Sequence, residues 1–201
     1  KASDDVLYTW AGPEIAVATT KAYTAQLLTL YMLALRLAQI TGRINDAHGT
    51  MLIGELCRVG ENIALLTEKL KDIAEALSRE LYTSEQMYFI GRNTDYAAAM
   101  EGALKLKEIS YINSQVYAAG ELKHGTISLI NQGTPVVAVA SQRNVFSKTL
   151  SNIAEVEARG AKVICVTDEK MSENISEEYE KIWKMDGGYP LPCDAGDDLL
   201  R

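Results

Sequence analysis

Three short apolar runs in the second half of the chain constrain its fold more than any other feature. They are MYFIG, TPVVAVA and AKVICVT, at residues 87–91, 134–140 and 161–167. Each run is apolar on both faces, as is typical of strands buried within a sheet. A helical pattern from Thr94 to about Ser110 follows the first run, and an amphipathic pattern from about Asn144 to Arg159 separates the other two. Strands that alternate with helices predict a parallel sheet covered by helices on both sides.

Two further segments extend this sheet. SQVYAAGE at 114–121 reads as a strand, and KIWKMD at 181–186 is another short apolar run. The fold class is therefore α/β, with a doubly wound parallel sheet. Because such sheets bind ligands at the carboxyl ends of their strands, the turns after Gly91, Val116, Ala140 and Val166 are where we expect a site.

The first part of the chain has a different pattern. Residues 18–40 form one long helical pattern with Thr19 or Thr20 as its N-cap, TGRIND interrupts it, and a second helical stretch runs from about Gly49 to Arg79. We therefore divide the chain into a helical segment at 1–80, an α/β part at 81–186 and an irregular tail at 187–201. A helical part with no sheet of its own to pack on suggests a fragment of a larger protein.

Composition excludes several classes of function. The net charge of -7 disfavours binding to a nucleic-acid backbone, and no run of about 18 apolar residues could span a membrane. Three widely spaced cysteines argue against a disulfide framework and for a reducing compartment, so we expect a cytoplasmic protein. Two distant histidines and no close cysteine pair argue against a structural zinc site, and no common nucleotide-binding or hydrolase motif occurs.

Three clusters of polar residues are candidates for chemistry. In the first, Glu101, Lys105 and Glu108 recur at helical spacing and share one face. A solvated ladder of ion pairs would have the same spacing. In the functional alternative, Glu108 acts as a base whose pKa is tuned by Lys105.

The second candidate is YAAGELKHGTISLI at 117–130, which contains His124. The histidine either completes a turn or carries a proton near neutral pH. Gly120 and Gly125 on either side indicate a backbone that turns tightly or approaches another group closely.

The third candidate is VATTKAYT at 17–24. Its hydroxyls either cap the helix that follows or, with the free N–H groups of the helix N-terminus, bind a sugar or a phosphate. GRNTDY at 91–96 is a similar strand–turn–helix junction, with Thr94 as the expected cap.

Two stretches resemble a known family. EGALKLKEISYINSQVYAAGELKHG at 101–125 closely resembles the isomerase part of the glucosamine-6-phosphate synthases, and AGPEIAVATTKAYTAQL at 11–27 resembles the segment that joins the two sugar-isomerase (SIS) subdomains of that family. The similarity covers most of residues 5–168. It implies an SIS-type doubly wound parallel sheet with flanking helices at 81–186, preceded by the end of a first SIS subdomain and its linker helices.

The resemblance also implies an activity. Enzymes of this family use ammonia released from glutamine by a separate glutaminase domain, aminate fructose 6-phosphate and isomerise the product to glucosamine 6-phosphate. The chain would then be an isomerase-domain fragment that binds these sugar phosphates, acts in a homodimer and requires no metal or redox cofactor. Neither the glutaminase domain nor the serine-rich phosphate loop of the first SIS subdomain is part of this sequence.

Site residues follow from the same resemblance. Glu108 matches the glutamate that moves a proton between C1 and C2 of the sugar, Lys105 matches a lysine beside it, and His124 matches the histidine that opens the sugar ring in the partner subunit. Val17, Ala18 and Thr19 match a stretch that lines the sugar site. The tail lacks the lysine that forms a Schiff base in the family, so we expect this chain alone to be incomplete for the full reaction.

Two other functions remain open at this point. The chain could be a noncatalytic SIS-type sugar-phosphate sensor, which would bind its ligand without turnover, or only a dimerisation core. The presence of both Glu108 and His124 favours the enzyme, since a sensor needs neither.

Overall fold

A computed structural model describes residues 3–168, Met171, Ile175 and 182–185. These residues belong to two compact units, which divide between Ala64 and Leu65. The irregular tail expected at 187–201 lies outside the described residues. Each unit is considered by itself below.

The first unit contains two helices joined by a tight turn. Residues 3–20 form no helix, α1 is Lys21–Ile40, and α2 is Asp46–Leu81, which continues into the second unit. Asn45 caps α2, because its side-chain oxygen accepts the N–H of His48 at 2.8 Å. The helical prediction therefore holds from Lys21 to Leu81, and TGRIND does interrupt it.

A small apolar core joins the helices of the first unit. It consists of four buried side chains and one that is half-buried: Leu35, Ala38, Ile44, Leu52 and Leu56. Gly49 permits close approach, since a Cβ atom there would lie 2.4 Å from the side-chain amide of Gln39. Much of the remaining apolar surface of α1 is exposed within this chain.

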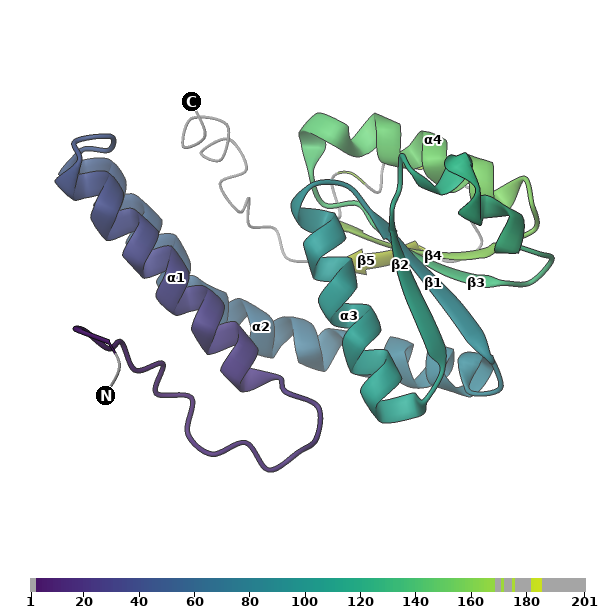
Figure 1. Ribbon diagram of the computed structural model, residues 1–201, viewed down its shortest axis with the longest axis horizontal. Helices are drawn as coiled ribbons and strands as arrows, with labels where there is room; N and C mark the ends of the chain where they lie inside the picture. The colour runs from purple at the N-terminus through teal and green to yellow at the C-terminus, as the bar shows by residue number, and fades with distance from the viewer. Residues whose placement is uncertain (1–2, 169–170, 172–174, 176–181, 186–201) are drawn as a thin grey trace. The chain divides into compact units, whose positions relative to one another are not determined.

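The second unit is the parallel sheet that the sequence predicts (Figure 1). Its five strands lie in the order β2-β1-β3-β4-β5, and all neighbouring pairs are parallel. The strands are β1 (Gln86–Gly91), β2 (Asn113–Ala118), β3 (Pro135–Val139), β4 (Lys162–Asp168) and β5 (Ile182–Met185). Every expected strand is present, with ends that differ from the prediction by a few residues.

Helices cover both faces of this sheet. Met87 and Phe89 of β1 pack in a cluster with Ala99 and Ala103 of α3 (Thr94–Ser110). Their neighbours Tyr88 and Ile90 point to the other face, into a larger cluster that contains Ile153 and Val156 of α4 (Phe146–Glu157). This alternation along one strand confirms the doubly wound arrangement.

Short 3-10 helices lie in the connections at the carboxyl ends of β2 and β3. They are η1 (Leu122–His124), η2 (Thr126–Leu129) and η3 (Arg143–Val145). Gly160 ends the α4 region with a φ of 86°, as its expected position after the helix requires. Within the described part of the chain, no helix has the length and apolar character of a membrane span.

Candidate functional site

The cluster predicted on α3 is formed in the structure. The Nζ atom of Lys105 lies 2.8 Å from a carboxylate oxygen of Glu108 and 3.4 Å from one of Glu101. The three side chains are 20%, 28% and 23% exposed, respectively. The ammonium therefore lies between two carboxylates on a half-buried helix face, which is less solvated than a surface ladder of ion pairs.

Lys105 remains a cation in this cluster. Its hydrogen bond to Glu108 raises the pKa of Lys105, and the negative charges of Glu108 and Glu101 act in the same direction. Side chains on neighbouring turns, Met100 and Leu104, are apolar and exposed, so the cluster borders an uncovered apolar surface.

His124 ends η1, in a turn fixed by its backbone. Its N–H donates to the carbonyl of Glu121 at 3.0 Å, and Leu122, 1% exposed, is buried in the core beneath the turn. The imidazole is exposed, and the structure shows no side-chain cap at η1. The histidine is therefore neither a core residue nor a cap in this chain.

The two glycines that bracket His124 have different roles. Gly125 has a φ of 147°, a conformation that residues with a side chain rarely adopt. Gly120 is needed for close approach, because a Cβ atom there would lie 2.8 Å from Nη2 of Arg92. The sequence left a tight turn and a close approach open as alternatives. The tight turn applies to Gly125 and the close approach to Gly120.

Glu108 and His124 lie at opposite ends of the sheet. Glu108 is in the last turn of α3, just before the amino end of β2, whereas His124 follows the carboxyl end of β2. The strand between them spans roughly 17 Å at about 3.3 Å per residue. Within one chain the structure does not bring these two residues together.

A polar network that the sequence analysis missed lies at the carboxyl ends of β1 and β3. Asp95, 3% exposed, accepts the N–H of Ser141 at 2.9 Å and its hydroxyl at 2.5 Å. Arg92 donates to the side-chain oxygen of Asn152 from Nε at 3.1 Å and from Nη2 at 2.8 Å. The side-chain amide of Gln142 donates to the carbonyl of Arg92 at 2.9 Å.

This network connects loops that are far apart in sequence. The junction GRNTDY contains Arg92 and Asp95 and signalled a strand–turn–helix, but nothing local identifies partners 46 to 60 residues away. The expected cap was also wrong: Asn93, not Thr94, is the N-cap residue of α3, and it makes no side-chain cap bond.

The segment Val17–Thr19 precedes α1 in the first unit. Val17 is 88% exposed, Ala18 is buried and Thr19 is exposed. Thr20 is the N-cap residue but does not cap with its hydroxyl; instead a carboxylate oxygen of Glu14 accepts the N–H of Thr20 at 2.8 Å and its hydroxyl at 3.3 Å. Thr20 is thus the N-cap residue, as the sequence predicts, but its hydroxyl makes no capping hydrogen bond and donates instead to Glu14, six residues earlier.

Glu14 also affects what this helix end can bind. Hydrogen bonds from the backbone N–H groups of Thr20 and Ala22 lower the pKa of Glu14. An internal carboxylate thus occupies part of the helix N-terminus that the sequence suggested for a sugar or a phosphate.

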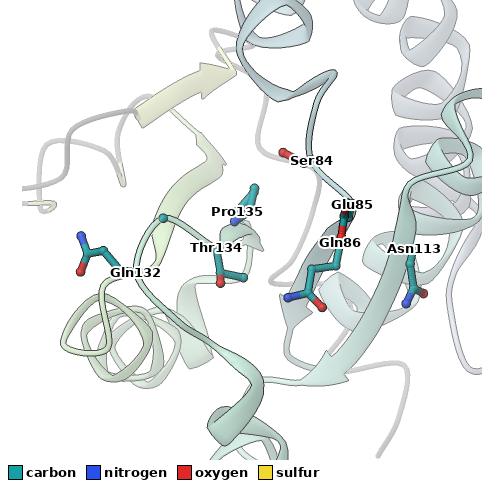
Figure 2. A pocket seen from close by; sticks show the side chains of 8 residues that line it. Ser84, Glu85, Gln86, Asn113, Gln132, Thr134 and Pro135 are labelled. Atoms are coloured by element: carbon teal, nitrogen blue, oxygen red, sulfur yellow. The ribbon is translucent and has the colours of Figure 1, made fainter.

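The pocket drawn in Figure 2 lies at the amino ends of the strands, where β1, β2 and β3 begin. It is lined mainly by polar residues, among them Glu85, Asn113 and Gln132. None of the residues predicted for the site lines it. We therefore assign no function to this hollow. Among the residues that the structure describes, no group of His, Cys, Asp and Glu side chains is arranged to hold a metal ion.

Comparison with known proteins identifies a family. The model of the SIS domain matches residues 80–182, which is half of the chain. The chain is 50% identical over 162 residues to the glutamine–fructose-6-phosphate aminotransferase (isomerizing) of Caldanaerobacter subterraneus, and 47% identical over 174 residues to that of Methanosarcina acetivorans. These matches cover 81% and 85% of this chain but only 26% and 28% of the relatives, so the chain spans about a quarter of their length.

Solved structures of related proteins have the same fold as this chain. The C-terminal domain of glucosamine-fructose-6-phosphate aminotransferase from Francisella tularensis matches with a TM-score of 0.83 and 36% identity, over 94% of this chain and 54% of that one. A phosphosugar isomerase described as putative, from Clostridium difficile 630, matches with a TM-score of 0.69 over 92% of this chain and 50% of that one; at 23% identity it supports the fold alone.

Proposed function

The chain belongs to the SIS domain family, and we propose that it is the isomerase part of an enzyme that makes glucosamine 6-phosphate from fructose 6-phosphate and glutamine-derived ammonia. The sequence identity to the isomerizing aminotransferases supports this proposal. In it, the chain binds a sugar phosphate and interconverts ketose and aldose forms. The cysteine content is the basis for placing it in the cytoplasm.

The observation that carries the proposal is the contact between Glu108 and Lys105. Isomerisation needs a base that takes a proton from C1 and returns it to C2, and an ionised carboxylate serves. The Lys105 ammonium donates a hydrogen bond to a carboxylate oxygen of Glu108 at 2.8 Å and so orients this side chain. In this proposal Lys105 also contributes positive charge next to the negative charge that develops on the enediol oxygen.

The remaining site residues have distinct roles in the proposal. Val17, Ala18 and Thr19 line the sugar site. His124 transfers a proton to open the sugar ring, and it acts in the site of a second copy of the chain. The separation of His124 from Glu108 along β2 supports that last point, because one chain cannot direct both at one sugar. We therefore propose a homodimer.

Activity of the complete protein that contains this chain tests the proposal. Glu108→Gln should abolish isomerisation of fructose 6-phosphate while calorimetry still detects binding, and the control Glu61→Gln, at an exposed position of α2, should leave both unchanged. Undiminished turnover in Glu108→Gln would remove the catalytic assignment. Binding without turnover in the unaltered protein would favour the sensor. A monomer in light scattering at micromolar concentration would contradict the shared site.

A further inference from the structure

His124 is exposed, so core packing does not hold its imidazole in place. Its position therefore depends on the backbone turn that carries it. The turn is fixed on two sides. Leu122 and Ala119 are buried in the core, and the N–H of Ala119 donates to the carbonyl of Gly91 at 2.9 Å. Between these two buried residues lies Gly120, which faces a different neighbour.

That neighbour is the guanidinium of Arg92. A Cβ atom at position 120 would lie 2.8 Å from Nη2 of Arg92 and 3.3 Å from both Cζ and Nη1. These distances place the Cβ position beside the edge that Nη1 and Nη2 form, so the end of the guanidinium packs against Gly120. Any side chain at position 120 would have to displace either the guanidinium or the turn.

Arg92 is held in place from the other side. Its Nε and Nη2 atoms both donate to one oxygen of Asn152, a buried residue of α4, whose amide in turn donates to Glu155 at 3.2 Å. The carbonyl of Arg92 accepts the Gln142 amide. A planar fork with two donors on one acceptor has little freedom of orientation.

From these contacts we propose that Arg92 is a positioning residue for His124. Because Arg92 is hydrogen-bonded to α4 and packs against Gly120, it fixes the turn Gly120–Gly125 relative to α4. The imidazole is thereby held where it can contact the sugar bound by a partner subunit. The proposal rests on the function proposed above for His124. A small displacement of a proton carrier is enough to cost up to about 100-fold in rate, so a residue that touches no substrate can still matter.

A direct contact between Arg92 and the sugar phosphate is the main alternative, and kinetics separate the two. Loss of a positioning residue lowers kcat and leaves KM nearly unchanged, whereas loss of a phosphate contact made equally in ground and transition states raises KM. In the complete protein we expect Arg92→Ala to lower kcat for fructose 6-phosphate by about tenfold, with KM within about twofold. The control Arg143→Ala, which removes an exposed positive charge from η3, should change neither.

Double variants test the route through His124. In the His124→Ala background, Arg92→Ala should have no further effect on kcat, because the group that it positions is gone. Gly120→Ala should lower kcat about as much as Arg92→Ala does. Combined with Arg92→Ala it should lower kcat no further, because the guanidinium that the new Cβ atom would clash with is then absent. Multiplicative losses in either pair would overturn the proposal, as would a raised KM.

Nuclear magnetic resonance tests the proposal without measuring turnover. A second histidine signal in the same spectrum shows whether the variant has misfolded. The imidazole proton resonance of His124, assigned by its absence in His124→Ala, should broaden or shift in Arg92→Ala, while that of His48 in the other unit should not change. An unchanged His124 resonance would overturn the proposal. Unchanged turnover in His124→Ala itself would overturn the proposed function and this inference together, whereas a slow His124→Ala beside a fully active Arg92→Ala would overturn this inference alone.

Discussion

The Nζ atom of Lys105 lies 2.8 Å from the carboxylate of Glu108, three residues further along the same helix. The contact to Glu101 on the preceding turn is longer, at 3.4 Å. One cation thus separates two carboxylates, which would otherwise repel each other. The consequences for activity and for stability can be measured separately.

Lys105→Met should impair catalysis by Glu108 without removing it. With the ammonium gone, the Glu108 carboxylate loses the hydrogen bond that orients it, and the site loses a positive charge. We expect kcat/KM of the complete protein to fall about tenfold at neutral pH. An unchanged kcat/KM would show that Lys105 does not support the base.

Lys105 should also contribute to stability over a defined pH range. Because its pKa is raised in the folded state, its contribution is fully present below the unfolded value of about 10.4 and is lost as pH rises through the higher folded value. The difference in free energy of unfolding between the unaltered chain and Lys105→Met should therefore be constant from pH 7 to about 10 and shrink above that. Urea titrations followed by circular dichroism measure this difference, and a constant gap beyond pH 11 would contradict it.

Asp95→Ala should be among the most destabilising single substitutions in the second unit. It removes both acceptors of Ser141 from a buried position, and hydrogen bonds to a charged group contribute about 1.5–3 kcal/mol each. We expect a loss of about 3 kcal/mol in urea unfolding, against almost none for the control Asp72→Ala on the exposed face of α2. A loss below about 0.5 kcal/mol would mean that the Asp95–Ser141 contact does not hold the loop.

The two described cysteines should differ strongly in reactivity. Cys57 is exposed, whereas burial, together with the charge of Asp95, raises the pKa of the Cys165 thiol to about 12. At pH 8 the thiolate fraction of Cys165 is then on the order of a thousandfold lower than that of an ordinary cysteine. Brief alkylation followed by peptide mapping should modify Cys57 but not Cys165, and unfolding in urea should remove the difference. Alkylation of Cys165 in the folded chain would contradict its burial.

Much of the second unit could be predicted because its signals are local. The continuous apolar run of β1 and the helical spacing along α3 are properties of neighbouring residues, so the strands, the helix Thr94–Ser110 and the shared face of Lys105 and Glu108 followed from the sequence. The contacts of Arg92 with Asn152 and of Asp95 with Ser141 join residues 60 and 46 positions apart, and periodicity carries no information about them. The capping hydrogen bonds failed for a related reason: a preference for Thr at an N-cap does not reveal that Glu14, six residues earlier, accepts a hydrogen bond from the N-cap residue Thr20.

Glu14→Ala should weaken the N-terminus of α1 in a pH-dependent way. The carboxylate accepts the N–H of Thr20, and this bond lowers the pKa of Glu14. A group with a lowered folded pKa stabilises above its unfolded value of about 4.3 and loses that contribution as pH falls through the folded value. We expect the exchange protection of the Thr20 amide at pH 7 to fall by about two- to tenfold in Glu14→Ala, with Glu14→Gln in between because its amide oxygen can still accept. Below the folded pKa the unaltered chain should approach the protection of Glu14→Gln. If Glu14→Ala protects the Thr20 amide as well as the unaltered chain at pH 7, Glu14 is not the cap of α1.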